Sequence, residues 1–215
     1  TSLVSRFEDL NTNIDDIYKG ETDDNIRPEA LKRWEERRDR IQYVPAKIPG
    51  FRRYYSLPSD RGGTMLEAVK TDDPDDWMNG VLIFGLTAEE EQHIKQTESI
   101  YEYIDIMDPE LDFYVDDADV PGFDLSDVDQ IRLFANTDSK TDISANAPRN
   151  QIYHNRIITG IMMIDDMYAT DLASRFYKDF CESTYETAYD AQNPSAFNTV
   201  RENDILKGDR KWTVK

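Results

Sequence analysis

Residues 79–90, NGVLIFGLTAEE, carry the clearest structural signal in this sequence. Their first part is a short continuous apolar run bounded by turn residues, which is typical of a buried strand. Their last part is a capping box, in which the Thr87 hydroxyl accepts from the Glu90 backbone and the Glu90 side chain reaches back to Thr87. The stretch therefore predicts a buried strand followed at once by a helix, which we expect to run to about Glu98.

Patterns typical of strands lie on both sides of this unit. Before it, residues 43–57 are extended and aromatic with a Pro-Gly pair in the middle, and residues 64–70 follow a glycine turn. After it, residues 101–107 and 130–135 also fit strands, the first with clear alternation. We therefore expect strands to dominate the first half of the chain.

Helical periodicity marks two further segments. Residues 28–42 open with a proline, which suits a first helical position, and residues 151–182 repeat apolar side chains at spacings of three or four. Strands with flanking helices predict the α+β class, with a small mixed β-sheet or barrel. We expect one domain over residues 1–184 and a polar C-terminal extension over residues 185–215.

The composition is strongly acidic. The 215 residues include 44 acidic and 25 basic side chains, so the formal net charge is -19. A nucleic-acid binder needs a basic surface, so nucleic acid is not expected as a partner. Apolar residues make up 39% of the chain, which is enough for a core. The acidity is therefore interpreted as a property of the surface and not as a sign of disorder.

The sequence also predicts a cytoplasmic protein that does not interact with a membrane. No apolar run approaches 18 residues, and no charged-then-apolar leader is present. The single cysteine, Cys181, excludes a disulfide framework.

Patterns for metal binding are weak. Residues 72–76, Asp-Asp-Pro-Asp-Asp, lack the turn glycine and the terminal glutamate of an EF-hand loop. His93 is expected at the surface, His154 in the core or at its boundary, and Cys181 in the core. Two isolated histidines and one cysteine give no metal triad, so we expect no metal site.

Glu98 is the carboxylate best placed for chemistry. It follows Ile94 by four residues, so both lie on the inward face of the expected helix. Glu89, Glu90 and Glu91 lie near the start of this helix, where negative charge is favourable, whereas Glu98 lies at its far end. A partly buried carboxyl at that end suits a general acid/base. The alternative is an ordinary boundary glutamate paired with an arginine.

Five stretches, in the right order along the chain, resemble motifs of the gamma-glutamylcyclotransferase superfamily. They are residues 2–6 (SLVSR), 45–55 (PAKIPGFRRYY), 80–84 (GVLIF), 87–101 with Glu98 and Tyr101, and 150–153 (NQIY) with Gly160. Each stretch alone is weakly specific, and their common order is fairly specific. The resemblance implies a gamma-glutamylcyclotransferase-like fold that covers most of the chain.

The resemblance also implies an enzyme that needs no metal or organic cofactor. In the family reaction, the α-amine of a γ-glutamyl group attacks its own side-chain amide carbonyl, which releases 5-oxoproline and a free amine. Nucleophile and electrophile belong to one molecule, so their effective molarity is already high. Glu98 matches the family's catalytic acid/base. The small γ-glutamyl substrate would be bound by Ser2, Leu3, Val4, Arg52, Tyr101 and Tyr153.

Departures from the family pattern leave a second interpretation open. Thr1 stands where the substrate loop has its glycine, and Lys95 stands where an aspartate is common. An alternative alignment places residues 18–26 on the loop motif but needs an insertion. The chain could instead be a non-catalytic binding or structural module on the same fold, as a monomer, a homodimer or a subunit of a larger assembly. A hydrolase with paired carboxylates is a third interpretation and lacks a suitable pair.

Overall fold

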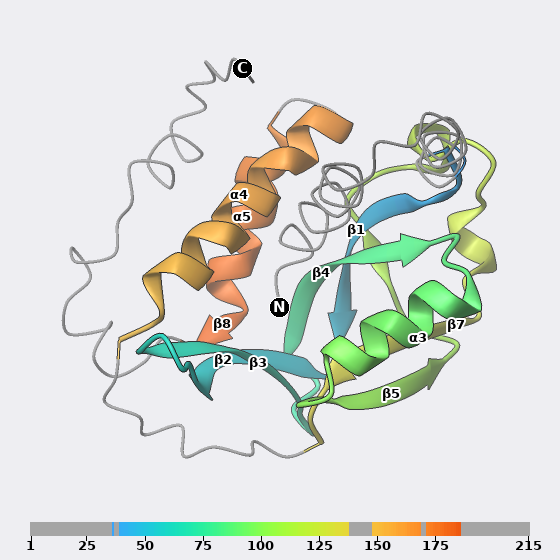
Figure 1. Ribbon diagram of the computed structural model, residues 1–215. Helices are drawn as coiled ribbons and strands as arrows, with labels where there is room; N and C mark the ends of the chain where they lie inside the picture. Colours follow the sequence, from blue (N-terminus) through green and yellow to red (C-terminus); the bar gives the residue numbers. More distant parts are fainter. Residues whose placement is uncertain (1–35, 37–38, 138–147, 169–170, 186–215) are drawn as a thin grey trace, which may run out of the picture.

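The computed structural model describes residues 36, 39–137, 148–168 and 171–185. These residues form three small sheets and three α-helices (Figure 1), which confirms the α+β class. The described strands do not close into a barrel. The sequence predicted either a small mixed sheet or a barrel, and the structure has small sheets.

The first sheet has β1 (Gln42–Pro49) at its centre, between β4 (Trp77–Phe84) and β6 (Asp112–Phe113). Both neighbours run antiparallel to β1. β4 contains the apolar run that predicted a strand, but only Met78 and Asn79 of this strand are buried. The strand is confirmed, and the prediction that the whole run is buried is wrong, because β4 lies at an edge of the sheet.

The second sheet has the order β3 (Thr64–Lys70), β2 (Phe51–Pro58) and β8 (Thr184–Tyr185). β2 pairs antiparallel with β3 and parallel with β8, so this sheet is mixed. The register between β2 and β3 shifts at a bulge between Tyr55 and Leu57. The side chains of β2 that precede the bulge alternate between the two faces of the sheet.

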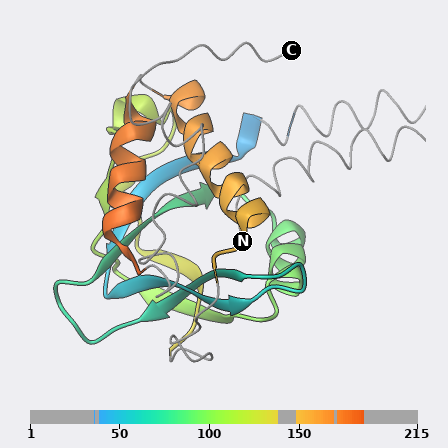
Figure 2. The same ribbon diagram turned by 90° about the vertical axis from the view of Figure 1, so that its left-hand side faces the viewer.

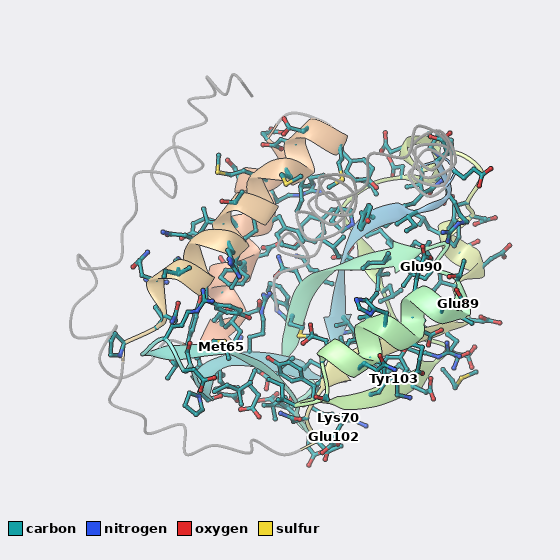
Figure 3. The ribbon with its side chains drawn as sticks, in the orientation of Figure 1. Met65, Lys70, Glu89, Glu90, Glu102 and Tyr103 are labelled. Atoms are coloured by element: carbon teal, nitrogen blue, oxygen red, sulfur yellow. The ribbon has the colours of Figure 1, made fainter. Side chains whose placement is uncertain are left out.

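The third sheet is an antiparallel pair of β5 (Glu102–Met107) and β7 (Gln130–Ala135). The helix α3 (Ala88–Thr97) lies alongside this pair (Figure 1). Tyr103 of β5 lies next to α3 (Figure 3), and its hydroxyl donates to Glu91 Oε1 at 2.5 Å. This bond ties α3 to the third sheet.

The start of α3 is the capping box that the sequence predicted. The Glu90 N–H donates to Thr87 Oγ1 at 3.2 Å, and the Thr87 N–H donates to Glu90 Oε2 at 2.8 Å. Glu89 and Glu90 lie at this end of the helix (Figure 3), where the helix dipole favours negative charge. A local sequence signal therefore fixes where α3 begins.

Two short 3-10 helices, η1 (Asp117–Asp119) and η2 (Leu125–Asp127), lie between β6 and β7. Val120 and Leu125 of this connection are buried against Val44 of β1 in a small apolar cluster. The connection is thus packed onto the first sheet.

The segment 151–182 is helical, as predicted, and consists of two helices, α4 (Gln151–Met167) and α5 (Leu172–Glu182). Asp171, directly before α5, has a φ of 71°. A continuous right-handed helix cannot contain such a residue, so the helical periodicity is interrupted here. The two helices lie side by side on one side of the strands (Figures 1 and 2).

The main hydrophobic core lies between these two helices and the strands. Side chains of α4 and α5 pack there against residues of β2 and β3 and against the residue that follows β6. Its buried members are Tyr55, Leu66, Tyr114, Ile158, Ile161, Ile164, Leu172, Ala173, Phe176, Tyr177 and Phe180.

Asn150, the N-cap of α4, ties this helix to the turn between β2 and β3. Its Nδ2 donates to the Gly62 carbonyl at 2.6 Å and to Ser59 Oγ at 3.1 Å. Gly63 has a φ of +71°, and a Cβ at this position would lie 2.6 Å from the Pro148 carbonyl oxygen, so a side chain does not fit. These contacts fix the first turn of α4 against the start of β3. This turn carries the candidate site residues Tyr153 and His154.

Some predictions lie outside the described residues. Of the helix expected over residues 28–42, Glu36, Asp39 and Arg40 are helical, and residues 28–35, 37 and 38 are not described. The predicted end is wrong, because Gln42 already pairs with Phe84 as the first residue of β1. Nearly all of the predicted extension, residues 186–215, is also outside. Among the helices that are described, none combines the length and the hydropathy needed to cross a bilayer.

Candidate active site

Glu98 is the C-cap residue of α3, and it lies inside the protein. The residue is only 6% exposed. Its backbone N–H donates to the Ile94 carbonyl at 3.0 Å, and its own carbonyl accepts from the Tyr101 N–H at 2.9 Å. Glu98 therefore has the inward position that its spacing from Ile94 predicted. The negative end of the helix dipole gives a carboxylate no stabilisation there.

The backbone of Leu66 in β3 brings two tyrosines close to Glu98. The Tyr101 hydroxyl donates to the Leu66 carbonyl oxygen at 2.9 Å, and the Tyr153 hydroxyl also forms a hydrogen bond with the Leu66 backbone. Burial raises the pKa of Tyr153 well above its ordinary value, and the negative charge of nearby Glu98 raises it further. The structure thus places three of the predicted site residues, Glu98, Tyr101 and Tyr153, together.

A buried pair of side chains, Tyr55 and His154, borders these residues. The Tyr55 hydroxyl lies 2.6 Å from His154 Nδ1, and Arg149 Nη1 lies 3.3 Å from His154 Nε2. A guanidinium can only donate, so Nε2 accepts and the hydrogen on Nδ1 points to Tyr55. The expectation that His154 is a core or boundary residue is confirmed, because it is 1% exposed.

Arg53 is a buried cation on the same face of β2 as Tyr55. Its Nη2 donates to Asn79 Oδ1 and, at 2.6 Å, to Ser183 Oγ. Its guanidinium carbon lies 4.3 Å from the centre of the Phe180 ring. Burial lowers the pKa of Arg53 to about 10, so the side chain is still charged at neutral pH.

Arg52, the predicted substrate ligand, lies on the opposite face of β2. Its Nε forms an ion pair with Asp76 Oδ1 at 2.6 Å, and its Nη1 donates to the Glu182 carbonyl at 2.9 Å. Its guanidinium also stacks on the Tyr185 ring, 4.7 Å from the centre. The role of Arg52 stays a prediction, and its charge is already paired. The sequence suggested either arginine of the Arg52-Arg53 pair for a substrate carboxylate, with one of them facing solvent, and the structure shows that Arg53 is the buried one.

The remaining candidates lie apart from Glu98 or outside the described residues. Ser2, Leu3 and Val4 belong to the part of the chain that is not described, so their role as substrate ligands stays a prediction. His93 is exposed, as predicted. Cys181 is also exposed, and the prediction that it is a core residue is wrong, because it lies off the buried stripe of α5.

Within the described residues, no group of three or more His, Cys, Asp or Glu side chains is arranged to hold a metal ion. Asp76, from the acidic stretch 72–76, pairs with Arg52.

An open surface depression of about 500 Å³ lies away from the Glu98 group. Its lining includes Lys47, which forms an ion pair with Asp179 at 2.8 Å, and Trp77. None of the predicted site residues lines it.

No model of a known protein family matches this sequence, and no curated protein and no solved structure matches it either. The function must therefore be inferred from the residues themselves.

The free energy of unfolding is expected to fall as the pH rises above about 10. Burial and the bond to Glu91 raise the pKa of Tyr103 to about 12, and burial raises the pKa values of Tyr114 and Tyr153 in the same direction. Between the ordinary and the raised pKa, the unfolded chain has lost a proton that the folded protein keeps, so ionisation favours unfolding. Arg53 acts in the opposite sense, because its pKa is lowered on folding, but it is one group against several tyrosines.

The measurement is a set of urea unfolding curves across this pH range, together with a titration of the phenolate absorbance. We expect part of the 12 tyrosines to ionise only as the protein unfolds. Ionisation of all of them near pH 10, without loss of stability, would contradict this prediction. Return to neutral pH should restore the original curve and serves as the control.

Proposed function

We propose that this protein is a gamma-glutamylcyclotransferase-like enzyme, which converts a small γ-glutamyl amide into 5-oxoproline and a free amine. The observation that supports this proposal most is that Glu98 is buried and lies near Tyr153, whose hydroxyl shares the Leu66 backbone with the hydroxyl of Tyr101. The sequence resemblance points to the same glutamate on independent grounds, because it does not use burial.

In the proposed reaction, Glu98 moves both protons. It takes a proton from the α-ammonium group, and the resulting amine attacks the γ-carbonyl carbon to form the new ring C–N bond. The tetrahedral intermediate then breaks the original amide C–N bond as Glu98 gives this proton to the departing nitrogen. The ring nitrogen loses its second proton to Glu98, which passes it to the released amine, so that the amine leaves as an ammonium ion. The glutamate ends in the state in which it began, so no cofactor is needed to balance the reaction.

Tyr153 is suited to stabilise the developing negative charge on the carbonyl oxygen. Its hydrogen bond with the Leu66 backbone lowers its pKa, which is the effect of an N–H that donates to the phenol oxygen. The hydroxyl hydrogen is then left to donate to substrate. Because burial raises the pKa of Tyr153 well above its ordinary value, the hydroxyl keeps this hydrogen at neutral pH.

Two further parts of the proposal come from the sequence. Backbone N–H groups of the Ser2-Leu3-Val4 stretch would hold the glutamyl head or the oxyanion, as the resemblance implies. The substrate would be a soluble γ-glutamyl compound of the cytoplasm.

The test is release of 5-oxoproline from a panel of γ-glutamyl amines, γ-glutamyl peptides and glutathione, at low and high salt. We expect release from at least one member of the panel. The acidic surface makes salt a necessary variable, since repulsion among like charges changes with ionic strength.

Circular dichroism and an intact-mass spectrum establish that the protein assayed is folded and complete. No release from such a preparation, at either salt concentration, would overturn the enzymatic proposal. The alternative, a non-catalytic module, would then be examined by its assembly with other proteins.

A further inference from the structure

Arg53 is a buried charge without an acidic partner. It is 9% exposed, and no described carboxylate forms an ion pair with it. The groups that act on its charge are the tyrosines Tyr55, Tyr114 and Tyr153 and the thiol of Cys181. Buried charges in proteins are usually paired, because an unpaired one has lost its hydration without compensation.

Asp179, the acid bonded to Tyr114, is already engaged elsewhere. Asp179 of α5 pairs with Lys47 at 2.8 Å and accepts from the Tyr114 hydroxyl at 2.5 Å. Lys47 and Asp179 therefore neutralise each other, and Asp179 does not neutralise the positive charge of Arg53.

Neighbouring side chains hold the Arg53 guanidinium in one orientation. Both of its hydrogen bonds, to Asn79 and Ser183, use Nη2, and its plane packs on Phe180. Asn79 is itself fixed, because its Nδ2 donates to the Phe176 carbonyl at 2.8 Å and therefore its Oδ1 faces Arg53. The Nε–H of Arg53 is buried and has no hydrogen-bond partner within the described part of the chain. A held guanidinium with a free donor is prepared to receive an anion.

Arg53 borders the same interior as Glu98. It points to the same face of β2 as Tyr55, and the pairing of β2 with β3 sets Arg53 opposite Ala68 and Tyr55 opposite Leu66. Leu66 is the residue that holds the two tyrosines beside Glu98. Tyr153 links the two groups, because it interacts with the charge of Arg53 and Glu98 in turn acts on Tyr153.

We propose that Arg53 forms a buried subsite for the carboxylate group of a small organic acid. This inference deepens the proposed function and rests on it for the identity of the ligand, which is then the α-carboxylate of the γ-glutamyl group. The carboxylate neutralises the charge of Arg53 and accepts a hydrogen bond from its free Nε–H. The γ-amide of the same molecule is thereby directed toward Glu98.

The test compares the binding of 5-oxoproline with that of 5-oxoprolinamide, which has the same ring but no carboxylate. Affinities are measured by titration calorimetry for the wild type, Arg53→Met and Arg53→Lys. We expect Arg53→Met to weaken 5-oxoproline binding about ten- to hundredfold, the range for a lost hydrogen bond to a charged group. Binding of the amide should not change, and Arg53→Lys should fall between the other two. Arg61→Met, at an exposed arginine of the β2–β3 turn, is the matched control and should bind like the wild type.

Two results would overturn the inference. One is 5-oxoproline binding in Arg53→Met that is as tight as in the wild type, and the other is a wild type that does not favour the acid over the amide. If Arg53→Met does not fold, the thermal unfolding of the wild type is measured with each compound instead. We then expect the acid, but not the amide, to raise the unfolding temperature. Binding needs no turnover, so loss of the enzymatic proposal and loss of this subsite are separate outcomes.

Discussion

Glu98→Gln is expected to keep the fold and to lower 5-oxoproline release by about 10²–10⁴-fold, the usual contribution of a general acid/base. An amide has nearly the shape of a carboxyl group but cannot take up the ammonium proton or return it to the leaving amine. Because Glu98 is almost fully buried, water does not easily replace it in either step. The measurement is the steady-state rate with the best substrate of the panel, alongside an unfolding curve for each variant.

Glu89→Gln is the matched control for this experiment. Glu89 belongs to the same helix and is exposed in its first turn, so the substitution removes the same charge without touching the interior. We expect its rate to equal that of the wild type. A Glu98→Gln variant that retains the wild-type rate would show that another group transfers the protons, and the buried His154 would then be the next residue to replace.

Most of the elements could be predicted because their signals are local. The capping box of Thr87 and Glu90 needs only four residues, and both of its hydrogen bonds are present. The strand limits at Thr64–Lys70 and Gln130–Ala135 agree with the prediction, since turn residues bound both segments. The inward position of Glu98 followed from its spacing to Ile94 alone.

The features that could not be predicted from the sequence depend on contacts between distant segments. Periodicity ran through 151–182 because α4 and α5 both present an apolar face, so it could not show the interruption at Asp171. Cys181 was misplaced for a different reason, because it directly follows Phe180 and so lies about 100° around the helix from this member of the buried stripe.

The choice between Arg52 and Arg53 shows the same limit at the site. Alternation predicts that adjacent strand residues face opposite ways, but not which of them faces the interior. That choice depends on Ser183 and Phe180, which are more than a hundred positions later in the chain and pack on Arg53. Only the folded structure brings these residues together.

Ile158→Ala is expected to reduce the free energy of unfolding by about 2–5 kcal/mol, the range for truncating a buried isoleucine. Ile158 lies on α4 at 0% exposure, within the core that α4 and α5 form with β2 and β3. The loss comes from the apolar surface no longer buried and from the cavity left behind. Since small domains are stable by about 5–15 kcal/mol, the loss is a large part of the total. Urea unfolding followed by circular dichroism measures it.

Ile152→Ala on the same helix makes the comparison specific. The residue type and the substitution are the same as at Ile158, but Ile152 is 55% exposed. Its truncation should therefore change the free energy of unfolding by about 0.5 kcal/mol or less. Similar losses at the two positions would mean that α4 does not pack on the strands through Ile158. Tyr153 and His154, one turn earlier on this helix, would then lose the support that places them beside Glu98 and Tyr55.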